Sequence, residues 1–405
     1  MLLTSLKSYN RSQFIKDVTA GIIVAIIALP LSIALALASG VGPEAGIFTA
    51  IVAGFVISAL GGSSVQIAGP TAAFATIVAG IVAKDGMDGL VIATILAGIF
   101  LVLMGLCHFG SLIKFIPFTI TTGFTSGIAV TIVIGQLKDF FGLTYPDGVK
   151  PIETTEKFRA VVENFSTINI DALIVGAVSL AVLIIAPYIF KRIPGSLIAV
   201  IIGILMVQFL PLKVSTIGNL YTISNSLPSF HLPAVSFEVV QNALPNAFTI
   251  AVLAAIESLL SCVVADGMIN GKHRSDMELV AQGAGNIASA LFGGIPATGA
   301  IARTAANIKN GGRTPIAGIV HSITLVIVLV VLMPYAGMIP MPTIAAILFI
   351  VAYNMCQWRT FVKLVKTAPK SDIIVLFASF ILTVLFDLVV AIEIGMVIAC
   401  LLFIK

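Results

Sequence analysis

The stretch of residues 293–312 reads GGIPATGAIARTAANIKNGG. Its glycines and its proline disfavour a continuous helix, and it includes one arginine, Arg303. The chain around it has 405 residues, of which 59% are hydrophobic and 10% charged, with a mean hydropathy of +1.14. Soluble domains carry about 25% charged residues. The chain is therefore predicted to be an all-α polytopic membrane protein with a helix interrupted at this stretch.

Apolar segments bounded by charged residues, glycine or proline predict twelve full-length membrane spans. They lie near residues 18–39, 44–61, 88–109, 118–141, 170–190, 194–211, 243–263, 277–293, 314–334, 340–356, 370–386 and 388–404. Two further apolar segments, residues 71–83 and 302–309, are too short to cross a hydrocarbon core of roughly 30 Å. We predict that they are half-helices, the third and the tenth of fourteen membrane segments.

The basic residues divide unequally between the two sides of the membrane. With fourteen segments, 15 of the 22 lysines and arginines fall on the side of both termini, 6 fall on the other side, and Arg303 is the remaining one. This excess predicts cytoplasmic termini and a multi-pass protein of the cell membrane. Residues 142–168 are predicted to form an external amphipathic segment, and residues 212–240 an extended connector.

A second stretch, GGSSVQIAGPTAAF from Gly61, has the same design as the first. Each begins with Gly-Gly, continues through eight or nine residues and leads into a half-helix, so that Thr71 occupies the offset of Arg303. The second stretch lies seven membrane segments after the first, and this odd number gives the two stretches opposite orientations. We therefore predict two inverted-topology repeats, residues 18–211 and 243–404, with a binding site near the membrane midplane.

The chemistry of two opposed half-helices favours a negatively charged ligand. Each helix begins with unpaired N–H groups and a partial positive charge, which together make an anion site. Arg303 in the first turn of the second half-helix adds a full charge. An arginine at mid-membrane costs about 2.5–3.5 kcal/mol, which a bound anion would offset. The alternatives are that Arg303 extends to the cytoplasmic surface or pairs with a carboxylate.

Glu257, in LAAIESLLSCVVADG, is the second charge predicted at mid-membrane. Ser261, four residues later, lies on the same helix face and is predicted to belong to the same cation-coupling site. A medium of low dielectric constant favours the protonated carboxyl, so Glu257 is predicted to take up a coupling cation, a proton rather than sodium. The alternative is a structural partner of Arg303 or of a backbone N–H group. Moving a divalent anion inward against 100 mV costs about 4.6 kcal/mol, which a co-transported cation reduces.

The residues do not indicate nucleic-acid binding, metal binding or enzymatic activity. The net charge of +4 is explained by basic loops and requires no nucleic-acid partner. The four histidines, interpreted as loop or helix-end residues, show no metal-binding spacing, and they are His108, His231, His273 and His321. An enzyme, a metal or another cofactor is therefore not expected. The four cysteines are interpreted as reduced packing residues.

Four segments resemble the sulfate permease family, called solute carrier family 26 in animals. They are DVTAGIIVAIIALPLSIALALASGVGPEAGIF (17–48), IAGPTAAF (67–74), AAIESLLSCVVADGM (254–268) and ELVAQGAGNIASALFGGIPATGAIARTAANIKNGGRTPIAG (278–318). The resemblance implies two inverted seven-segment repeats forming UraA-like core and gate domains, with an anion site between segments 3 and 10. It allows a homodimer. Family members usually continue into a STAS domain, which is not expected within residues 1–405, so STAS-mediated dimerisation and regulation are in doubt.

The resemblance also implies a set of site residues. Those of the anion site are Thr71, Ala72, Ala73, the backbone around Ala302 and Arg303, and Leu31 with Leu35 from the first span. Glu257 occupies the family's acidic position on segment 8, associated with proton coupling. Sodium-coupled bicarbonate relatives resemble this chain less here, because they tend to carry aspartate at that position and lack the arginine.

The leading hypothesis is a secondary transporter that carries a small inorganic oxyanion, sulfate, inward with a proton by alternating access. A sodium-coupled bicarbonate or dicarboxylate transporter of the same family is the first alternative. A nucleobase permease of the same fold is a further alternative. That family binds the base with carboxylates on segments 8 and 10, whereas segment 10 of this chain has Arg303. An uncoupled anion channel would use the same positive site without needing Glu257 to titrate. The expected partners are the anion and the lipid bilayer.

Overall fold

The computed structural model describes residues 1–2, 9–111, 118–146, 151–190, 193–224, 226–233 and 237–385. The predicted span at 388–404 lies outside the described residues. The described chain is almost entirely helical, and eight of its helices are long and apolar enough to cross a membrane. The total of fourteen segments and the cytoplasmic location of the termini stay predictions. The chain divides into two compact units.

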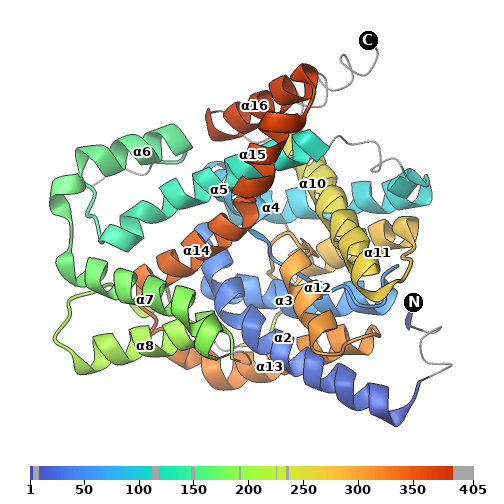
Figure 1. Cartoon of the computed structure of the whole chain (residues 1–405), viewed down its shortest axis with the longest axis horizontal. Coiled ribbons are helices and arrows are strands. Elements are labelled where there is room, and N and C mark those ends of the chain that lie inside the picture. Colours follow the sequence, from blue (N-terminus) through green and yellow to red (C-terminus); the bar gives the residue numbers. More distant parts are fainter. Residues whose placement is uncertain are drawn as a thin grey trace. The chain divides into compact units, whose positions relative to one another are not determined.

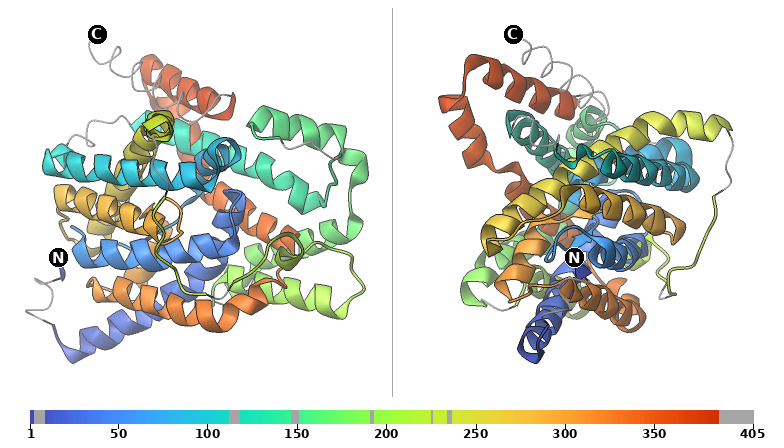
Figure 2. Two further views of the ribbon diagram at one scale, coloured as in Figure 1. Left: turned by 180° about the vertical axis from the view of Figure 1, so that it is seen from behind. Right: turned by 90° about the vertical axis from the view of Figure 1, so that its right-hand side faces the viewer.

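The first unit comprises residues 1–74, 84–114 and 223–335. Its elements, besides most of α4, are α2 (Arg11–Ala38), α3 (Pro43–Leu60), β1 (Ala68–Gly69), α10 (Phe237–Ile269), α11 (Ser275–Leu291), β2 (Thr298–Gly299), α12 (Ile301–Lys309) and α13 (Ile316–Ala336). The helix α3 packs against α2 and α11 (Figure 2), and α12 packs against α2 and α10 (Figure 1). Helices from distant parts of the sequence therefore share one core.

The second unit comprises residues 75–83, 115–222 and 336–405. Its described elements are α5 (Phe118–Phe141), α6 (Thr154–Glu163), η2 (Phe165–Thr167), α7 (Ile170–Ile189), α8 (Gly195–Phe209), α9 (Ile217–Leu220), α14 (Met341–Cys356), α15 (Trp358–Thr367) and α16 (Lys370–Leu385). The helix α5 packs against α14 and α16, and α7 lies beside α8 (Figure 1). This unit also combines helices from both ends of the sequence.

The helix α4 (Ala72–Leu106) contains the first predicted half-helix. It begins one residue after the predicted start at Thr71, and its backbone leaves helical geometry at Gly86, where φ is 72° and ψ is −169°. A positive φ is readily adopted by glycine and disfavoured for other residues. The prediction of a short helix followed by a separate apolar span is confirmed, with Gly86 as the point of separation.

Two segments differ from the sequence-based predictions. Residues 212–240 were predicted to be an extended connector, but they contain α9 and the first turn of α10. The helix α15 was not predicted, and Gln357, in the left-handed conformation with φ 43° and ψ 43°, separates it from α14. The predicted amphipathic segment at 142–168 contains α6, whose first turn has a capping box formed by Glu153 and Glu156.

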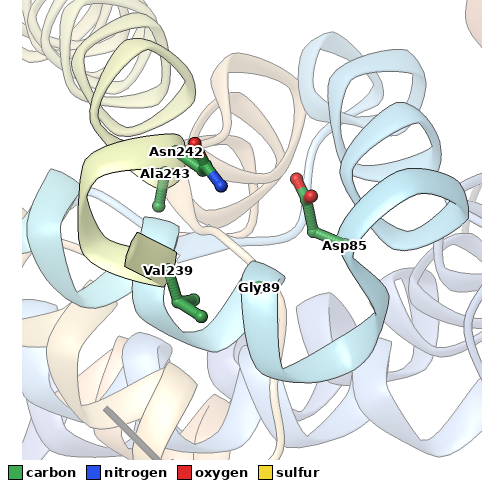
Figure 3. A pocket seen from close by; sticks show the side chains of 5 residues that line it. All are labelled: Asp85, Gly89, Val239, Asn242 and Ala243. Carbon is green, nitrogen blue, oxygen red and sulfur yellow. The ribbon is translucent and has the colours of Figure 1, made fainter. Parts of the chain in front are cut away.

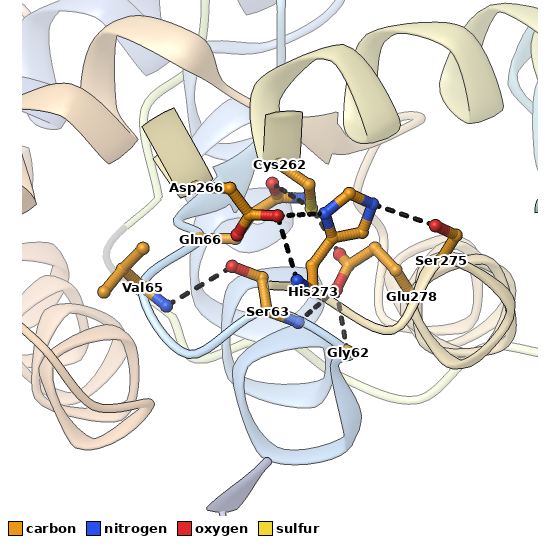
Figure 4. Close-up of polar contacts among 9 residues, drawn as sticks. All are labelled: Gly62, Ser63, Val65, Gln66, Cys262, Asp266, His273, Ser275 and Glu278. Carbon is orange, nitrogen blue, oxygen red and sulfur yellow. Dashed lines mark hydrogen bonds and ion pairs between the residues drawn. The ribbon is translucent and has the colours of Figure 1, made fainter. Parts of the chain in front are cut away.

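The glycine break after α3 is held by one buried carboxyl group (Figure 4). Glu278 of α11, which is 0% exposed, accepts hydrogen bonds from the backbone N–H of Gly62 at 2.8 Å and of Ser63 at 3.0 Å. It also accepts from the side-chain amides of Gln66 and Gln282, at 2.8 and 2.9 Å. Buried backbone donors need such partners where helix geometry cannot supply them, so Glu278 replaces the missing helical hydrogen bonds.

We predict that Glu278→Ala lowers the free energy of unfolding by about 3 kcal/mol or more, because it strands several buried donors at once. The thermal midpoint of the detergent-solubilised protein, followed by size-exclusion chromatography after heating, measures this change. Glu163→Ala removes an exposed carboxylate from α6 and is the matched control. Equal midpoints for the two variants would contradict the role assigned to Glu278.

Candidate functional site

The two glycine-rich stretches meet as a short pair of strands. The strands β1 and β2 are antiparallel, with Ala68 opposite Gly299 and Gly69 opposite Thr298. The N–H of Ala300 donates to the carbonyl of Ile67 at 2.9 Å, which extends the pairing. Interrupted backbone is tolerated at membrane depth when it is buried in protein and its polar groups are paired. Each interruption therefore supplies hydrogen-bond partners for the other.

A helix begins directly after each strand. The N-cap of α4 is Thr71 and the N-cap of α12 is Ala300, and neither makes a side-chain capping hydrogen bond. Because the strands are antiparallel, the chain leaves the pair in opposite directions, and the two helices begin at its opposite ends. Both N-termini retain N–H groups without helical partners and the positive end of a helix dipole.

Arg303 lies in the first turn of α12. Its side chain is 1% exposed, and Nη2 donates to Ser32 Oγ of α2 and to the carbonyl of Pro70, both at 3.3 Å. Its Nε and Nη1 have no hydrogen-bond partner among the described residues. No ion pair joins it to a carboxylate in the described part of the chain. Surface exposure of Arg303 is therefore wrong, and no carboxylate among the described residues pairs with it.

Two consecutive residues of α10 contact the two glycine-rich stretches. Glu257 contacts the stretch that contains β1, and Ser258 contacts the stretch that contains β2. Glu257 Oε2 accepts a hydrogen bond from the Thr71 hydroxyl at 3.0 Å. Ser258 Oγ lies 2.6 Å from Thr298 Oγ1 and accepts from the N–H of Gly299 at 3.2 Å. Thr71 thus bonds across to α10 instead of capping its own helix. One turn of α10 thereby joins the start of α4 to the strand that precedes α12.

Ser261 forms a hydrogen bond with a residue of α12. Its Oγ donates to Thr304 Oγ1 at 3.4 Å, and Thr304 Oγ1 also accepts from the N–H of Ile67 at 3.1 Å. No hydrogen bond joins Ser261 to Glu257 within the described residues. Ser261 therefore supports the interruption at β1, and its predicted part in cation coupling stays a prediction.

The remaining predicted residues lie around the same helix starts. Ala72 and Ala73 are 7% and 0% exposed, and Leu35 is 1% exposed. Leu31 is partly exposed and Ala302 is exposed. The strands that precede α4 and α12 are paired, whereas contact between these apolar side chains and a ligand stays a prediction.

The sequence reasoning missed several polar residues of this region. Ser32, Ser258 and Thr298 are each 0% exposed. Ser32 bonds to Arg303, and Ser258 bonds to Thr298. His321, interpreted as a loop or helix-end residue, lies in the second turn of α13, is 0% exposed, and its ring nitrogens have no partner in the described chain. The sequence of an apolar helix does not indicate which groups its serine and threonine hydroxyls will form hydrogen bonds with.

A pocket of about 110 Å³ lies elsewhere in the first unit (Figure 3). It is lined by Asp85, Gly89, Val239, Asn242 and Ala243, with Asp85 and Asn242 facing each other across it. None of these residues belongs to the region around β1 and β2. A carboxylate at its wall opposes binding of an anion, so the pocket is not a candidate for the predicted ligand.

Comparison with known proteins gives similarity over nearly the whole chain. The family model described as the sulfate permease family matches residues 14–379. The Bacillus subtilis (strain 168) protein named "Putative sulfate transporter YvdB" is 42% identical, over 98% of this chain and 75% of that protein. Bicarbonate transporter BicA of Picosynechococcus sp. (strain ATCC 27264 / PCC 7002 / PR-6) is 33% identical, over 95% of this chain and 69% of that protein.

Solved structures show the same fold. The transmembrane domain of a cyanobacterium bicarbonate transporter BicA superposes with a TM-score of 0.84 at 29% identity, covering 95% of this chain and 98% of that domain. The structure of murine Slc26a9, an anion transporter in the inward-facing state, superposes with a TM-score of 0.90 at 20% identity. The match covers 99% of this chain and 70% of that chain. The predicted all-helical membrane-domain fold is confirmed.

The packing of Arg303 against β1 yields a stability prediction. A Cβ atom added at Gly69 would overlap Arg303 Nη1, whereas one at Gly80 of α4 would meet nothing. We predict that Gly69→Ala lowers the free energy of unfolding by about 1–3 kcal/mol, and that Gly80→Ala does not lower it. Thermal midpoints in detergent measure both.

The origin of this effect is tested by adding Arg303→Ala to each variant. The cost of Gly69→Ala should disappear in that background, because the overlapping group is gone. A cost that persists at full size would show that Gly69 does not contact the guanidinium.

Proposed function

Because this chain belongs to the sulfate permease family, we propose that it carries a small inorganic oxyanion, sulfate, inward together with a proton by alternating access. The observation that carries the proposal is the strand pair β1–β2. It holds two uncapped helix N-termini beside a buried arginine with unpartnered N–H groups. The chain acts as a transporter of anions, not as an enzyme.

The anion binds between the starts of α4 and α12. Sulfate offers four oxygen acceptors, and backbone N–H groups at helix N-termini are suited to them. The buried charge of Arg303 provides further attraction in a medium where charge is weakly screened. Ser32 and the Pro70 carbonyl hold its Nη2 in place, which leaves Nε and Nη1 able to interact with the anion or with water beside it.

The coupling proton binds to Glu257. The Thr71 hydroxyl has a single hydrogen, which is donated to Glu257 at 3.0 Å while that carboxylate is ionised. When Glu257 takes up a proton, its own hydroxyl can donate to Thr71 Oγ1, and the hydrogen of Thr71 becomes available to the anion. Proton uptake and anion binding then favour each other, as thermodynamic linkage requires.

Bicarbonate is the second candidate substrate. It is favoured by the 33% identity to Bicarbonate transporter BicA and by the fold similarity to the transmembrane domain of BicA. Uptake of radiolabelled sulfate and bicarbonate into proteoliposomes, under imposed proton or sodium gradients, separates the candidates. Accumulation of sulfate driven by protons supports the proposal, and accumulation of bicarbonate driven by sodium overturns it.

We predict that Arg303→Ala raises the KM for sulfate about 30-fold or more, the effect of losing roughly 2 kcal/mol from a buried charged contact. Arg303→Lys, which keeps the charge, should have a smaller effect. Initial uptake rates in proteoliposomes measure the KM, and Arg159→Ala, at an exposed position in α6, is the control. An unchanged KM in correctly folded Arg303→Ala would contradict the proposed anion site.

We predict that Glu257→Gln abolishes proton-driven accumulation and keeps sulfate exchange, because the amide carbonyl still accepts from Thr71 but cannot carry a proton. At zero membrane potential, one pH unit should drive about 10-fold accumulation by a one-proton wild type and none by the variant. Glu238→Gln, an exposed position on the same helix, is the matched control. A channel would show no accumulation in any of the three proteins.

Thr71 tests the link between the proton and the anion. The affinity of the wild type for sulfate should rise as the pH falls. Thr71→Val should remove this pH dependence, and Thr71→Ser, which keeps the hydroxyl, should retain it. A pH dependence that survives in Thr71→Val would show that the linkage runs through another group.

A further inference from the structure

The helix α15 has the length and the boundaries of an interfacial helix. Its ten residues reach only about 15 Å, half of a hydrocarbon core. Gln357 in the left-handed conformation separates it from α14, and Ala368 and Pro369 separate it from α16. It therefore lies between two apolar helices without itself being able to span a bilayer.

The positive charges of α15 form a single stripe. Arg359, Lys363 and Lys366 follow the spacing i, i+4 and i+7 and lie on one face of α15, and Lys370 follows as the first residue of α16. We call these four residues the basic stripe. All four are exposed, the segment 357–371 contains no acidic residue, and none of the four forms an ion pair with a described residue.

The apolar residues of α15 pack against α16, which exposes apolar side chains. Phe361 packs edge-on against Phe377 and Phe380 of α16, with ring centroids 5.7 and 5.6 Å apart. On α16, Ile374 is 62% exposed, as expected where a membrane helix contacts lipid. Trp358, at the start of α15, is 47% exposed. Amphipathic aromatic rings of this kind favour the level of the lipid headgroups.

The other ten-residue amphipathic helix, α6, differs in its charges. It has two cations, Lys157 and Arg159, and two anions, Glu156 and Glu163. Arg159 Nε pairs with Glu163 Oε1 at 2.7 Å. An unpaired row of cations is therefore a property of α15, and not of every short helix between spans.

We propose that α15 lies in the membrane interface and binds the headgroups of anionic phospholipids along the basic stripe. Basic residues beside a membrane span attract anionic lipids, and an amphipathic helix with an apolar face lies in the interface plane. The charge count of the sequence assigns this segment to the side of the termini, where anionic lipids of the cytoplasmic leaflet would be available. The proposal is independent of the transported ion.

The single tryptophan of the chain makes α15 directly observable, because Trp358 is its own fluorescent probe. The protein is reconstituted in phosphatidylcholine nanodiscs that contain either brominated phosphatidylglycerol or brominated phosphatidylcholine, whose bromines quench tryptophan on contact. Half-maximal quenching of Trp358 should need an at least five-fold lower mole fraction of the anionic lipid, roughly the effect of one interfacial cation. High salt should reduce this preference.

Substitutions then identify the groups responsible. In Arg359→Gln/Lys363→Gln/Lys366→Gln the two lipids should quench equally, whereas the arginine-for-lysine variant Lys363→Arg/Lys366→Arg should keep the preference. Lys157→Gln/Arg159→Gln in α6 is the matched control and should also keep it. Equal quenching in the wild type, or a preference that survives the triple substitution, overturns the proposal. Quenching by neither lipid also overturns it and would assign the stripe to a protein partner.

Discussion

The pairing of β1 with β2 is the constraint on which the site depends. Two residues from each strand are paired, the hydrogen bond from Ala300 to Ile67 extends the pairing, and helices begin within three residues of both strands. Without it, the unpaired backbone of two broken helices would be buried at a cost of several kcal/mol per group. The adjacent residues Glu257 and Ser258 add side-chain contacts to both interruptions from one turn of α10.

Carboxyl groups accept hydrogen bonds from the backbone near these interruptions, whereas no described carboxylate forms an ion pair with Arg303. Glu278 accepts from Gly62 and Ser63, and buried Asp17 accepts from the N–H of Arg313 at 2.8 Å and from the Thr314 hydroxyl at 2.6 Å. Among the described residues, the hydrogen-bond partners of Arg303 are neutral oxygens. An ion pair at Arg303 would neutralise the charge that attracts an anion, so neutral partners orient the guanidinium while preserving its positive field.

The proposed anion site and the basic stripe present positive charge in opposite ways. Arg303 is buried, so its charge acts over short distances in weakly polarisable surroundings and is costly without a ligand. The stripe on α15 is exposed and screened by water and salt, so each cation contributes little alone and the row acts together. Exposed cations can exchange partners freely, which suits a fluid lipid surface better than a selective binding site.

The sequence by itself determined the membrane class, most helix positions, and the two interruptions, because these depend on local hydropathy and on glycine and proline. The short helix predicted at 302–309 is found at 301–309. Tertiary structure alone decided which groups meet: that Thr71 bonds to Glu257, that Ser261 turns to Thr304, and that Arg303 is buried against Ser32. Hydrogen bonds between residues about 40 to 270 positions apart depend on how helices rotate and pack, and helical periodicity does not encode that choice.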